Sequence, residues 1–310
     1  MADGEALRET VYASLKRLAE LEYDARGFSL LPRQPVASIL AGRHASRLRG
    51  RGLNFEELRG YIRGDDIRNI DWKATARMRK PFVRVYSEER DRPVVLVVDQ
   101  RSSMFFGTRL YMKSVTALHV AALFAWRAFH AGDRVGAVIF NDSEVRRIAP
   151  HRSRRQVLRI LGAGVRANRM LRAETTGDSG AAMLDEALGR ARRMAGHDNL
   201  IVIVSDFAGA GEETRRLILT AVEHNDVVAA LVHDPAAMEL PAAARLVVTD
   251  GELQVELNLA DRRVREPVLA FTRGRLRETE EFLKSLAIPV LPVHTGAEAA
   301  GQVRVLLGGR

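Results

Sequence analysis

Short apolar runs alternate with helical stretches from residue 91 onward, and this alternation constrains the fold more than any other feature. Residues 94–98 and 200–205 are continuous and rich in β-branched side chains, which is typical of parallel strands covered on both faces. Residues 110–131, rich in Ala and Leu, have a helical pattern. The order predicts a doubly wound, mainly parallel sheet with helices on both faces, a Rossmann-like α/β fold.

The rest of this region continues the pattern. The further expected elements are strands at 134–140, 144–148, 226–233 and 288–293 and helices at 154–161, 181–194, 212–224 and 267–286. The strand at 144–148 is expected to run antiparallel to its predecessor. An Asp250-Gly251 turn between two short apolar runs predicts a β-hairpin. Pro267 is expected in the first turn of the last long helix, where a missing N–H is tolerated.

The first 90 residues differ in character from the rest. Residues 5–24 carry leucines at helical spacing and predict an amphipathic helix. Residues 42–90 are basic and punctuated by glycine, and they carry too much charge to form a core alone. We therefore expect residues 1–90, the helix and a basic segment, to pack as an extension on a sheet domain of residues 91–310.

Composition limits the classes of function. The chain of 310 residues has no apolar run near the roughly 20 residues needed to cross a bilayer. Its first residues lack the pattern of a secretory signal. The absence of cysteine excludes disulfides, thiolate catalysis and cysteine zinc sites, and together these features predict a cytoplasmic protein. The net charge of +9 favours nucleic acid, an anionic membrane surface or an acidic partner.

Two aspartates end two of the predicted central strands. Asp99 follows the run 94–98, and Asp206 follows 200–205. Ligands of open α/β sheets bind beyond the carboxyl ends of such strands, so we expect both carboxylates in one crevice. With Ser103 they supply oxygen ligands of the kind that Mg²⁺ and Mn²⁺ prefer.

The spacing around Asp99 resembles the metal-ion-dependent adhesion site of von Willebrand factor A domains, which reads Asp-x-Ser-x-Ser. Arg101 stands at the place of the first serine. In that pattern a threonine from a further loop completes the site, and the comparable loop here precedes the helix at 181–194. Asp178 takes the threonine position in the best register, and Thr176 and Ser179 are close enough to substitute.

Arg101 changes the electrostatics of this site. A guanidinium stays protonated and cannot ligate a cation. The favoured interpretation is that Arg101 pairs with a carboxylate and occupies the space of the metal, or meets an acidic residue of a partner. A magnesium or manganese site at Asp99, Ser103 and Asp206 stays open as the alternative, if Arg101 points outward.

With the N-terminal segment included, the chain resembles the bacterial and archaeal domain-of-unknown-function family fifty-eight. The residues that carry the resemblance are 50–59, 61–77, 97–99 and 103–108, with the stretch from Gly64-Asp65-Asp66 to Asp71-Trp72 as the most specific part. The resemblance implies a von Willebrand factor A-like protein that acts as an adaptor or chaperone-like partner of a MoxR-type AAA+ ATPase. No catalytic activity is established for that family.

The most specific stretch also has a physical interpretation. Asp65, Asp66 and Asp71 lie among arginines and lysines, so we expect internal ion pairs. Trp72 is expected to anchor the segment by burying a large area. Both a partner-binding role and a purely structural role remain open for this stretch.

The sequence therefore predicts a non-enzymatic, protein-binding adaptor. Two alternatives belong to other classes. One is a magnesium-dependent phosphoryl hydrolase that uses the paired aspartates, and the other is a nucleic-acid-binding protein that uses the basic residues 43–90. No phosphate-binding loop of the Gly-x-x-x-x-Gly-Lys-Ser/Thr type is present, so ATP hydrolysis would have to come from a partner.

Overall fold

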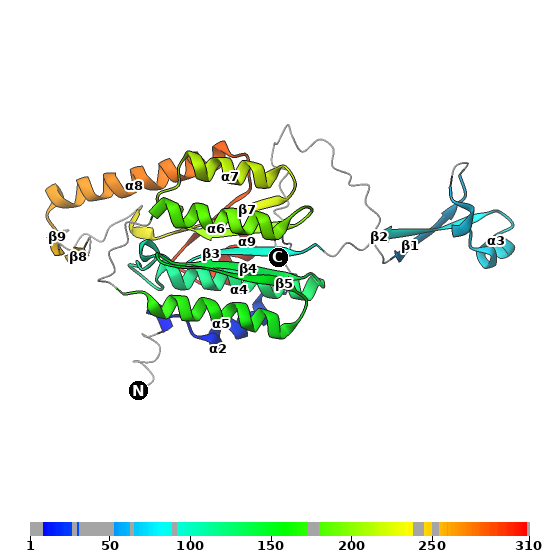
Figure 1. The fold of residues 1–310 in the computed structure, drawn as a ribbon, viewed down its shortest axis with the longest axis horizontal. Helices are drawn as coiled ribbons and strands as arrows, with labels where there is room; N and C mark the ends of the chain where they lie inside the picture. The colour runs from blue at the N-terminus through cyan, green and yellow to red at the C-terminus, as the bar shows by residue number, and fades with distance from the viewer. Residues whose placement is uncertain are drawn as a thin grey trace. The chain divides into compact units, whose positions relative to one another are not determined.

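Contacts divide the chain into two units in the computed structural model (Figure 1). The sheet domain comprises Met1–Ile39 and Arg92–Arg310, and the hairpin unit comprises Leu40–Asp91. The structure describes residues 9–26, 30, 53–62, 65–88, 92–172, 180–237, 245–249, 254–258 and 260–308.

A six-stranded sheet forms the centre of the sheet domain, with the strand order β10-β7-β6-β3-β4-β5. All neighbours pair in parallel except β5, which runs antiparallel to β4. The strands are β3 (Val94–Asp99), β4 (Val135–Phe140), β5 (Val145–His151), β6 (Leu200–Ser205), β7 (Asp226–His233) and β10 (Val290–His294). This arrangement confirms the predicted doubly wound α/β fold.

Helices cover both faces of the sheet, because alternate strand side chains enter two separate cores. Along β3, Leu96 packs in one core with α2, α4, α5 and α9, and Val97 packs in the other with α6, α7 and the end of α8 (Figure 1). The helices are α2 (Leu15–Asp24), α4 (Lys113–Ala131), α5 (Arg154–Met170), α6 (Gly180–Ala195), α7 (Glu212–Val222), α8 (Arg262–Ser285) and α9 (Ala299–Leu306).

The N-terminal helix belongs to the sheet domain, which differs from the predicted division at residue 90. Helix α2 buries Leu18 and Leu21 in the core beside α4. The indole Nε1 of Trp126 on α4 donates to the Leu18 carbonyl at 3.0 Å. The leucine spacing thus corresponds to the face of α2 that packs on α4. Only the basic segment, within residues 40–91, belongs to the second unit. Whether the hairpin unit packs on that domain stays a prediction.

Helix α8 begins earlier than Pro267 suggested. The side chain of Asp261 accepts a hydrogen bond from the backbone N–H of Arg263 and caps the helix at that point. Pro267 therefore lies in the second turn, not in the first. Between β7 and α8, strands β8 (Arg245–Thr249) and β9 (Gln254–Asn258) pair antiparallel as the predicted hairpin, and its Asp250-Gly251 turn lies outside the described residues.

The hairpin unit is a two-stranded antiparallel ribbon with two short helical turns. Strands β1 (Leu53–Gly60) and β2 (Phe82–Glu88) pair, and η1 (Ile67–Asn69) and α3 (Trp72–Met78) lie between them in the chain. The aspartates of the specific stretch stabilise these turns. Asp66 caps η1 through the N–H of residue 68, and Asp71 caps α3 through those of residues 73 and 74.

The structure bears on two expectations for this unit. Asp65 forms the expected ion pair with Arg59, at 2.8 Å, and Asp66 and Asp71 cap η1 and α3. Trp72 does not anchor the unit by burial, because 71% of its surface is exposed. Among its described side chains only Asp71 and Val83 are buried, so the described part of the unit has no core that could receive an indole.

Within the described residues, no helix combines the length and the apolarity that crossing a bilayer requires.

Candidate functional site

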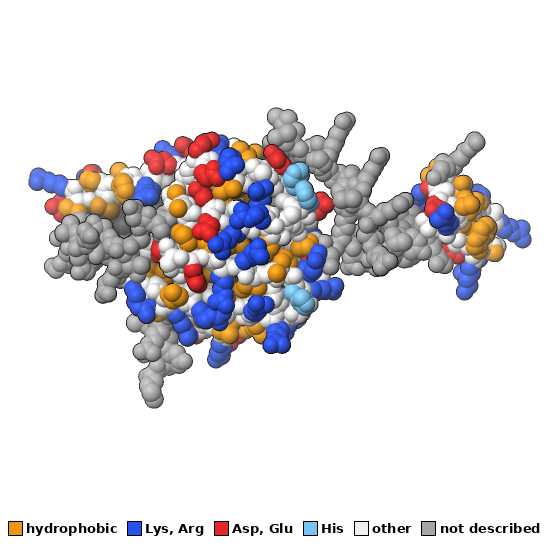
Figure 2. Space-filling model, in the orientation of Figure 1, with side chains coloured by type: hydrophobic (Ala, Val, Ile, Leu, Met, Phe, Trp, Pro, Cys, Tyr) orange, Lys and Arg blue, Asp and Glu red, His pale blue; other side chains and the backbone are white. Residues whose placement is uncertain are grey.

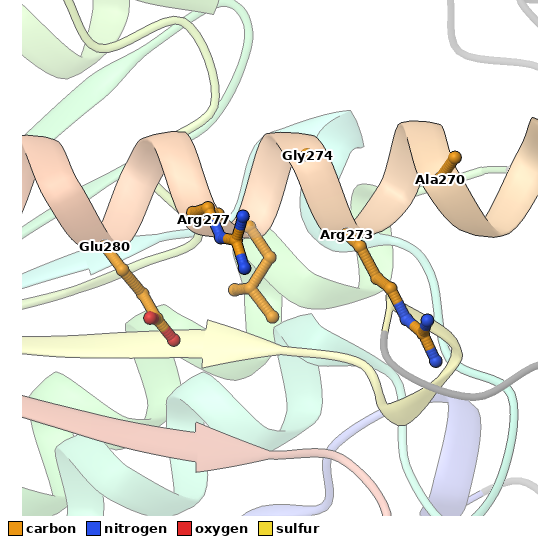
Figure 3. A pocket seen from close by; sticks show the side chains of 6 residues that line it. Ala270, Arg273, Gly274, Arg277 and Glu280 are labelled. Carbon is orange, nitrogen blue, oxygen red and sulfur yellow. The ribbon is translucent and has the colours of Figure 1, made fainter.

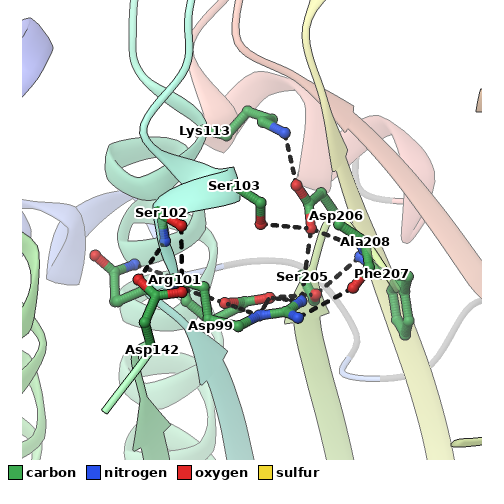
Figure 4. A network of polar contacts seen from close by, with 11 residues as sticks. Asp99, Arg101, Ser102, Ser103, Lys113, Asp142, Ser205, Asp206, Phe207 and Ala208 are labelled. Atoms are coloured by element: carbon green, nitrogen blue, oxygen red, sulfur yellow. Dashed lines mark hydrogen bonds and ion pairs between the residues drawn. The ribbon is translucent and has the colours of Figure 1, made fainter. Parts of the chain in front are cut away.

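The ends of β3 and β6 bring together the side chains that the sequence singled out. These strands are parallel neighbours, so Asp99 at the end of β3 and Asp206 just after β6 meet at one edge of the sheet (Figure 4). Arg101 and Ser103, from the turn after β3, lie between them. The structure thus assembles four of the five predicted site residues. Asp178, with Thr176 and Ser179, lies outside the described residues.

Arg101 points inward and binds Asp99. Its Nη2 donates to Asp99 Oδ2 at 2.7 Å, and its Nε lies 3.0 Å and 3.1 Å from the two carboxylate oxygens. The backbone N–H of Arg101 also donates to Asp99 Oδ1 at 2.9 Å, and the hydroxyl of Ser205 donates to Oδ2 at 2.6 Å. Both oxygens of Asp99 are therefore occupied by donors from the protein itself.

The rest of the guanidinium is enclosed as well. Arg101 Nη1 donates to the Ala208 carbonyl at 3.0 Å, and the group lies 5.5 Å from the centroid of the Phe140 ring. Only 1% of the residue is exposed. A cation held this deeply needs a partner charge and hydrogen bonds, which Asp99 and the carbonyl provide.

Lys113, a residue that the sequence analysis did not single out, binds Asp206. It is the first residue of α4, and its Nζ lies 2.6 Å from Asp206 Oδ2. Asp206 Oδ1 accepts from the Ser103 hydroxyl at 3.3 Å and from the Ala208 N–H at 3.0 Å, and Arg101 Nη2 is 3.8 Å away. The only sequence signal for Lys113 was its place at the start of the helix that follows β3.

Each of the two central carboxylates of the cluster is paired with a cation. Two carboxylates, Asp99 and Asp206, face one guanidinium and one ammonium. Burial raises the pKa of Asp99, although the charge and the hydrogen bonds of Arg101 act to lower it. Burial acts in the same direction on Asp206, but Lys113 and Arg101 outweigh it and lower the pKa of that carboxyl. Burial acts to lower the pKa of Arg101, but the charges of Asp99 and Asp206 outweigh this effect and raise that pKa.

Backbone geometry contributes to the cluster at Phe207. This residue has φ of 54°, in the left-handed region, which side chains larger than glycine rarely adopt. Its N–H donates to the hydroxyl of Ser205 at 2.8 Å. The turn directs the N–H of Ala208 to Asp206 and its carbonyl to Arg101. A buried phenylalanine in this conformation could not be inferred from the sequence.

The neighbouring strand end supplies one more carboxylate. Asp142, in the turn after β4, accepts from the backbone N–H of Ser102 at 2.8 Å and from its hydroxyl at 3.2 Å. This contact fixes the turn that carries Arg101 and Ser103. The serine beside Arg101 therefore binds a structural carboxylate, a role that the sequence analysis did not assign to it.

The donor set does not fit a divalent cation in this arrangement. The oxygens of Asp99 and Asp206 that would face a metal already accept hydrogen bonds from Arg101 and Lys113. Among the described residues, no group of three histidine, cysteine, aspartate or glutamate side chains is placed to hold a metal ion. A cation would have to displace both of these positive groups.

The surface above the cluster is partly apolar. Ser103 and Lys113 are half-buried, and the following loop exposes Phe106 and Leu110. The loop is fixed to the cluster, because the N–H of Lys113 donates to the Phe106 carbonyl at 2.7 Å. The accessible part of the site is therefore a rim around a closed network of charges.

A separate hollow of about 420 Å³ runs along α8 (Figure 3). Its described lining consists of Ala270, Arg273, Gly274, Leu276, Arg277 and Glu280. It contains no residue of the charged cluster and no pair of groups suited to acid–base chemistry, so the cluster at the sheet edge remains the candidate site.

Comparison with known proteins identifies the family. The profile of the family described as "Protein of unknown function DUF58" matches residues 57–279. The chain belongs to this family. The match covers most of the hairpin unit's described part, the charged cluster and most of α8. It therefore continues well beyond residue 108, where the motifs that carried the resemblance end.

Relatives of this DUF58 chain include uncharacterised proteins of Mycobacterium tuberculosis and Mycobacterium bovis. They are 31% identical over 271 residues, which is 87% of this chain and 83% of theirs. Among solved structures, BatB of Bacteroides thetaiotaomicron is 14% identical over 69% of this chain and 95% of its own, with a TM-score of 0.43. An aerotolerance-related membrane protein of Bacteroides fragilis is 12% identical over 70% and 98%, with a TM-score of 0.43.

Proposed function

We propose that this DUF58 protein is a non-enzymatic, cytoplasmic adaptor that captures another protein at the sheet edge around Asp99 and Asp206. The partner that the family resemblance favours is a MoxR-type AAA+ ATPase. In this proposal the cluster is a degenerate metal-ion-dependent adhesion site of the von Willebrand factor A type, in which fixed positive side chains replace the metal.

The single observation that carries the proposal is the position of Arg101. Its guanidinium lies against Asp99 at 2.7 Å, where a metal-dependent site would keep its carboxylate free for the cation. The ammonium of Lys113 likewise lies against the carboxylate of Asp206. The two side chains together supply the two positive charges that a divalent cation would supply, so the carboxylates are neutralised without one.

This arrangement sets how a partner is held. A metal-completed site takes a carboxylate of the partner as a ligand, but Arg101 is buried and its described partners are internal. Recognition would instead use the rim: the Ser103 hydroxyl, the Lys113 ammonium and the exposed Phe106 ring. Capture would then be independent of divalent cations at this site.

The cluster also argues against the hydrolase alternative. A phosphoryl hydrolase needs a free carboxylate as nucleophile or general base. Asp99 is fully buried and bound by Arg101 and Ser205, so it cannot reach a substrate in this arrangement. A phosphatase assay with Mg²⁺ is expected to give no turnover above that of an Asp99→Asn variant.

The direct test is binding to a MoxR-type ATPase at fixed Mg²⁺ and nucleotide, measured by biolayer interferometry. Phe106→Ser is expected to weaken binding roughly 30-fold, as for a central aromatic contact. Phe271→Ser is the matched control, because Phe271 is also exposed but lies on α8. Equal binding by wild type and Phe106→Ser, or equal losses in both variants, would contradict the proposed site.

A further inference from the structure

The described part of the hairpin unit exposes several large apolar side chains, and cations follow them in the sequence. Ile62, Ile67, Trp72 and Met78 are exposed by 64%, 66%, 71% and 58% of their surface. Each is followed directly in the chain by a cation, at Arg63, Arg68, Lys73 and Arg79. Figure 2 shows hydrophobic and basic side chains side by side on this unit. Scattered single apolar residues need no explanation, but a group of this size within one short segment does.

The three acidic side chains that the structure describes in this unit make internal contacts. Asp65 binds Arg59, and Asp66 and Asp71 cap η1 and α3. In contrast, Lys73 and Arg77, one turn apart on α3, are exposed and form no ion pair with any residue that the structure describes. The described surface therefore combines apolar groups with two cations that form no ion pair there.

We propose that this surface, defined by Ile62, Ile67, Trp72, Lys73, Arg77 and Met78, docks the protein on an anionic phospholipid bilayer. Indole rings and aliphatic side chains enter the boundary between head groups and acyl chains, and adjacent Lys and Arg contact the anionic head groups. The long stems of these cations allow the charge to stay in the head-group layer while the neighbouring side chain inserts. This docking concerns the hairpin unit and is independent of the function proposed for the sheet edge.

The chemistry of the apolar residues favours lipid over nucleic acid. A single-stranded nucleic acid would stack bases on Trp72 and pair phosphates with Lys73 and Arg77. It would leave Ile62, Ile67 and Met78 without a role, since aliphatic side chains offer no stacking surface. A bilayer boundary uses all of these groups and requires no concave, shape-matched surface.

The two tryptophans make the test specific. Trp126 is fully buried and hydrogen-bonded to Leu18, whereas Trp72 is exposed. The difference in fluorescence between the wild type and Trp72→Phe is therefore the emission of Trp72, which reports on the hairpin unit alone. We expect the emission of Trp72 to shift to the blue when vesicles of phosphatidylcholine and phosphatidylglycerol, two to one, are added. Co-sedimentation should weaken as salt rises, because salt screens the charges.

Variants separate the two components of binding. Lys73→Glu with Arg77→Glu should weaken vesicle binding about 30-fold or more, and Arg146→Glu with Arg147→Glu, an exposed pair on β5, should leave it much less affected. Ile67→Ala with Trp72→Ala should also weaken binding, whereas Phe271→Ala should not.

Three results would overturn the proposal. One is the absence of vesicle binding at low salt. Another is emission from Trp72 that is already typical of a buried indole before vesicles are added, because the protein itself would then cover the surface. The third is tight binding of a single-stranded oligonucleotide, with quenching of Trp72, in the absence of vesicle binding.

Discussion

The sheet domain and the hairpin unit differ in how far their charged and aromatic side chains are buried. In the sheet domain, Arg101 and Asp99 are enclosed in a network, and Trp126 is fully buried. In the hairpin unit, Asp66 and Asp71 serve as caps and Trp72 remains exposed. The comparison indicates that Arg101, Asp99 and Trp126 find their partners within the sheet domain, whereas the described part of the hairpin unit leaves its tryptophan exposed.

Replacing each tryptophan by alanine tests this contrast with the largest expected difference. Trp126→Ala removes a buried ring and its hydrogen bond to Leu18, so we expect a loss of about 3–5 kcal/mol in the free energy of unfolding. Trp72→Ala removes an exposed ring and should change it by less than about 0.5 kcal/mol. Urea denaturation measures both. A large loss in Trp72→Ala would show that the ring is covered within the protein.

Breaking the buried ion pair should have a comparable effect. Asp99→Ala leaves the Arg101 charge buried without its main partner, so we expect a loss of about 3–5 kcal/mol in the free energy of unfolding. Asp65→Ala removes a partner of Arg59 at the surface and should have a much smaller effect.

The control is the double variant Asp99→Ala with Arg101→Met. It removes the unpaired charge and should be more stable than Asp99→Ala alone. Equal stability of the two would mean that the buried charge is not what makes the single change costly.

The pH dependence of stability should also separate the units. Burial lowers the pKa of His119 to about 4, so its folded form stays neutral while the unfolded chain binds a proton below about pH 6.5. The contribution of His119 to the free energy of unfolding is therefore fully present above pH 6.5. It is lost as the pH falls toward 4, by roughly 3 kcal/mol in total. His119→Phe, which keeps a ring against Tyr111, should flatten this part of the profile.

The described part of the hairpin unit carries no histidine. Hydrogen exchange of its backbone amides, corrected for intrinsic rates, is expected to show no change in local opening over the same pH range. A profile that stays steep in His119→Phe would assign the effect to other groups.

The smallest expected effect concerns the caps of the hairpin unit. Asp71→Ala removes the acceptor for two N–H groups at the start of α3 and should destabilise this turn by about 1 kcal/mol. Asp71→Asn keeps an acceptor and should retain most of the stability. Faster hydrogen exchange confined to α3 is the expected readout, and an equal change throughout the sheet domain would contradict the separation of the two units.

The sequence was most informative where apolar runs are buried on both faces. Strands β6 and β7 were predicted with their observed bounds, because the runs are continuous and end at Asp206 and His233. The position of Arg101 in the serine pattern also indicated a site unlike the usual metal site. Helix α8 begins before Pro267, where its start was predicted, because the side chain of Asp261 caps the helix more than one turn earlier.

Two features of the structure could not be inferred from local pattern, one in the candidate site and one in the hairpin unit. Lys113 reaches Asp206 only because the start of α4 and the end of β6 meet at one edge of the sheet, which is a property of the topology. Trp72 was expected to be buried, because aromatic residues usually are. It is exposed because the described part of the hairpin unit buries only Asp71 and Val83, and the residue type alone does not show whether neighbours can cover it.

The most direct test of the central claim, that Arg101 and Lys113 replace a divalent cation, is calorimetric titration with Mg²⁺ and Mn²⁺. We predict no saturable heat for the wild type, binding by Arg101→Ser, and tighter binding by Arg101→Ser with Lys113→Ala. Saturable binding by the wild type that Asp99→Asn abolishes would contradict the claim, because the carboxylates would then accept a metal in the presence of both side chains.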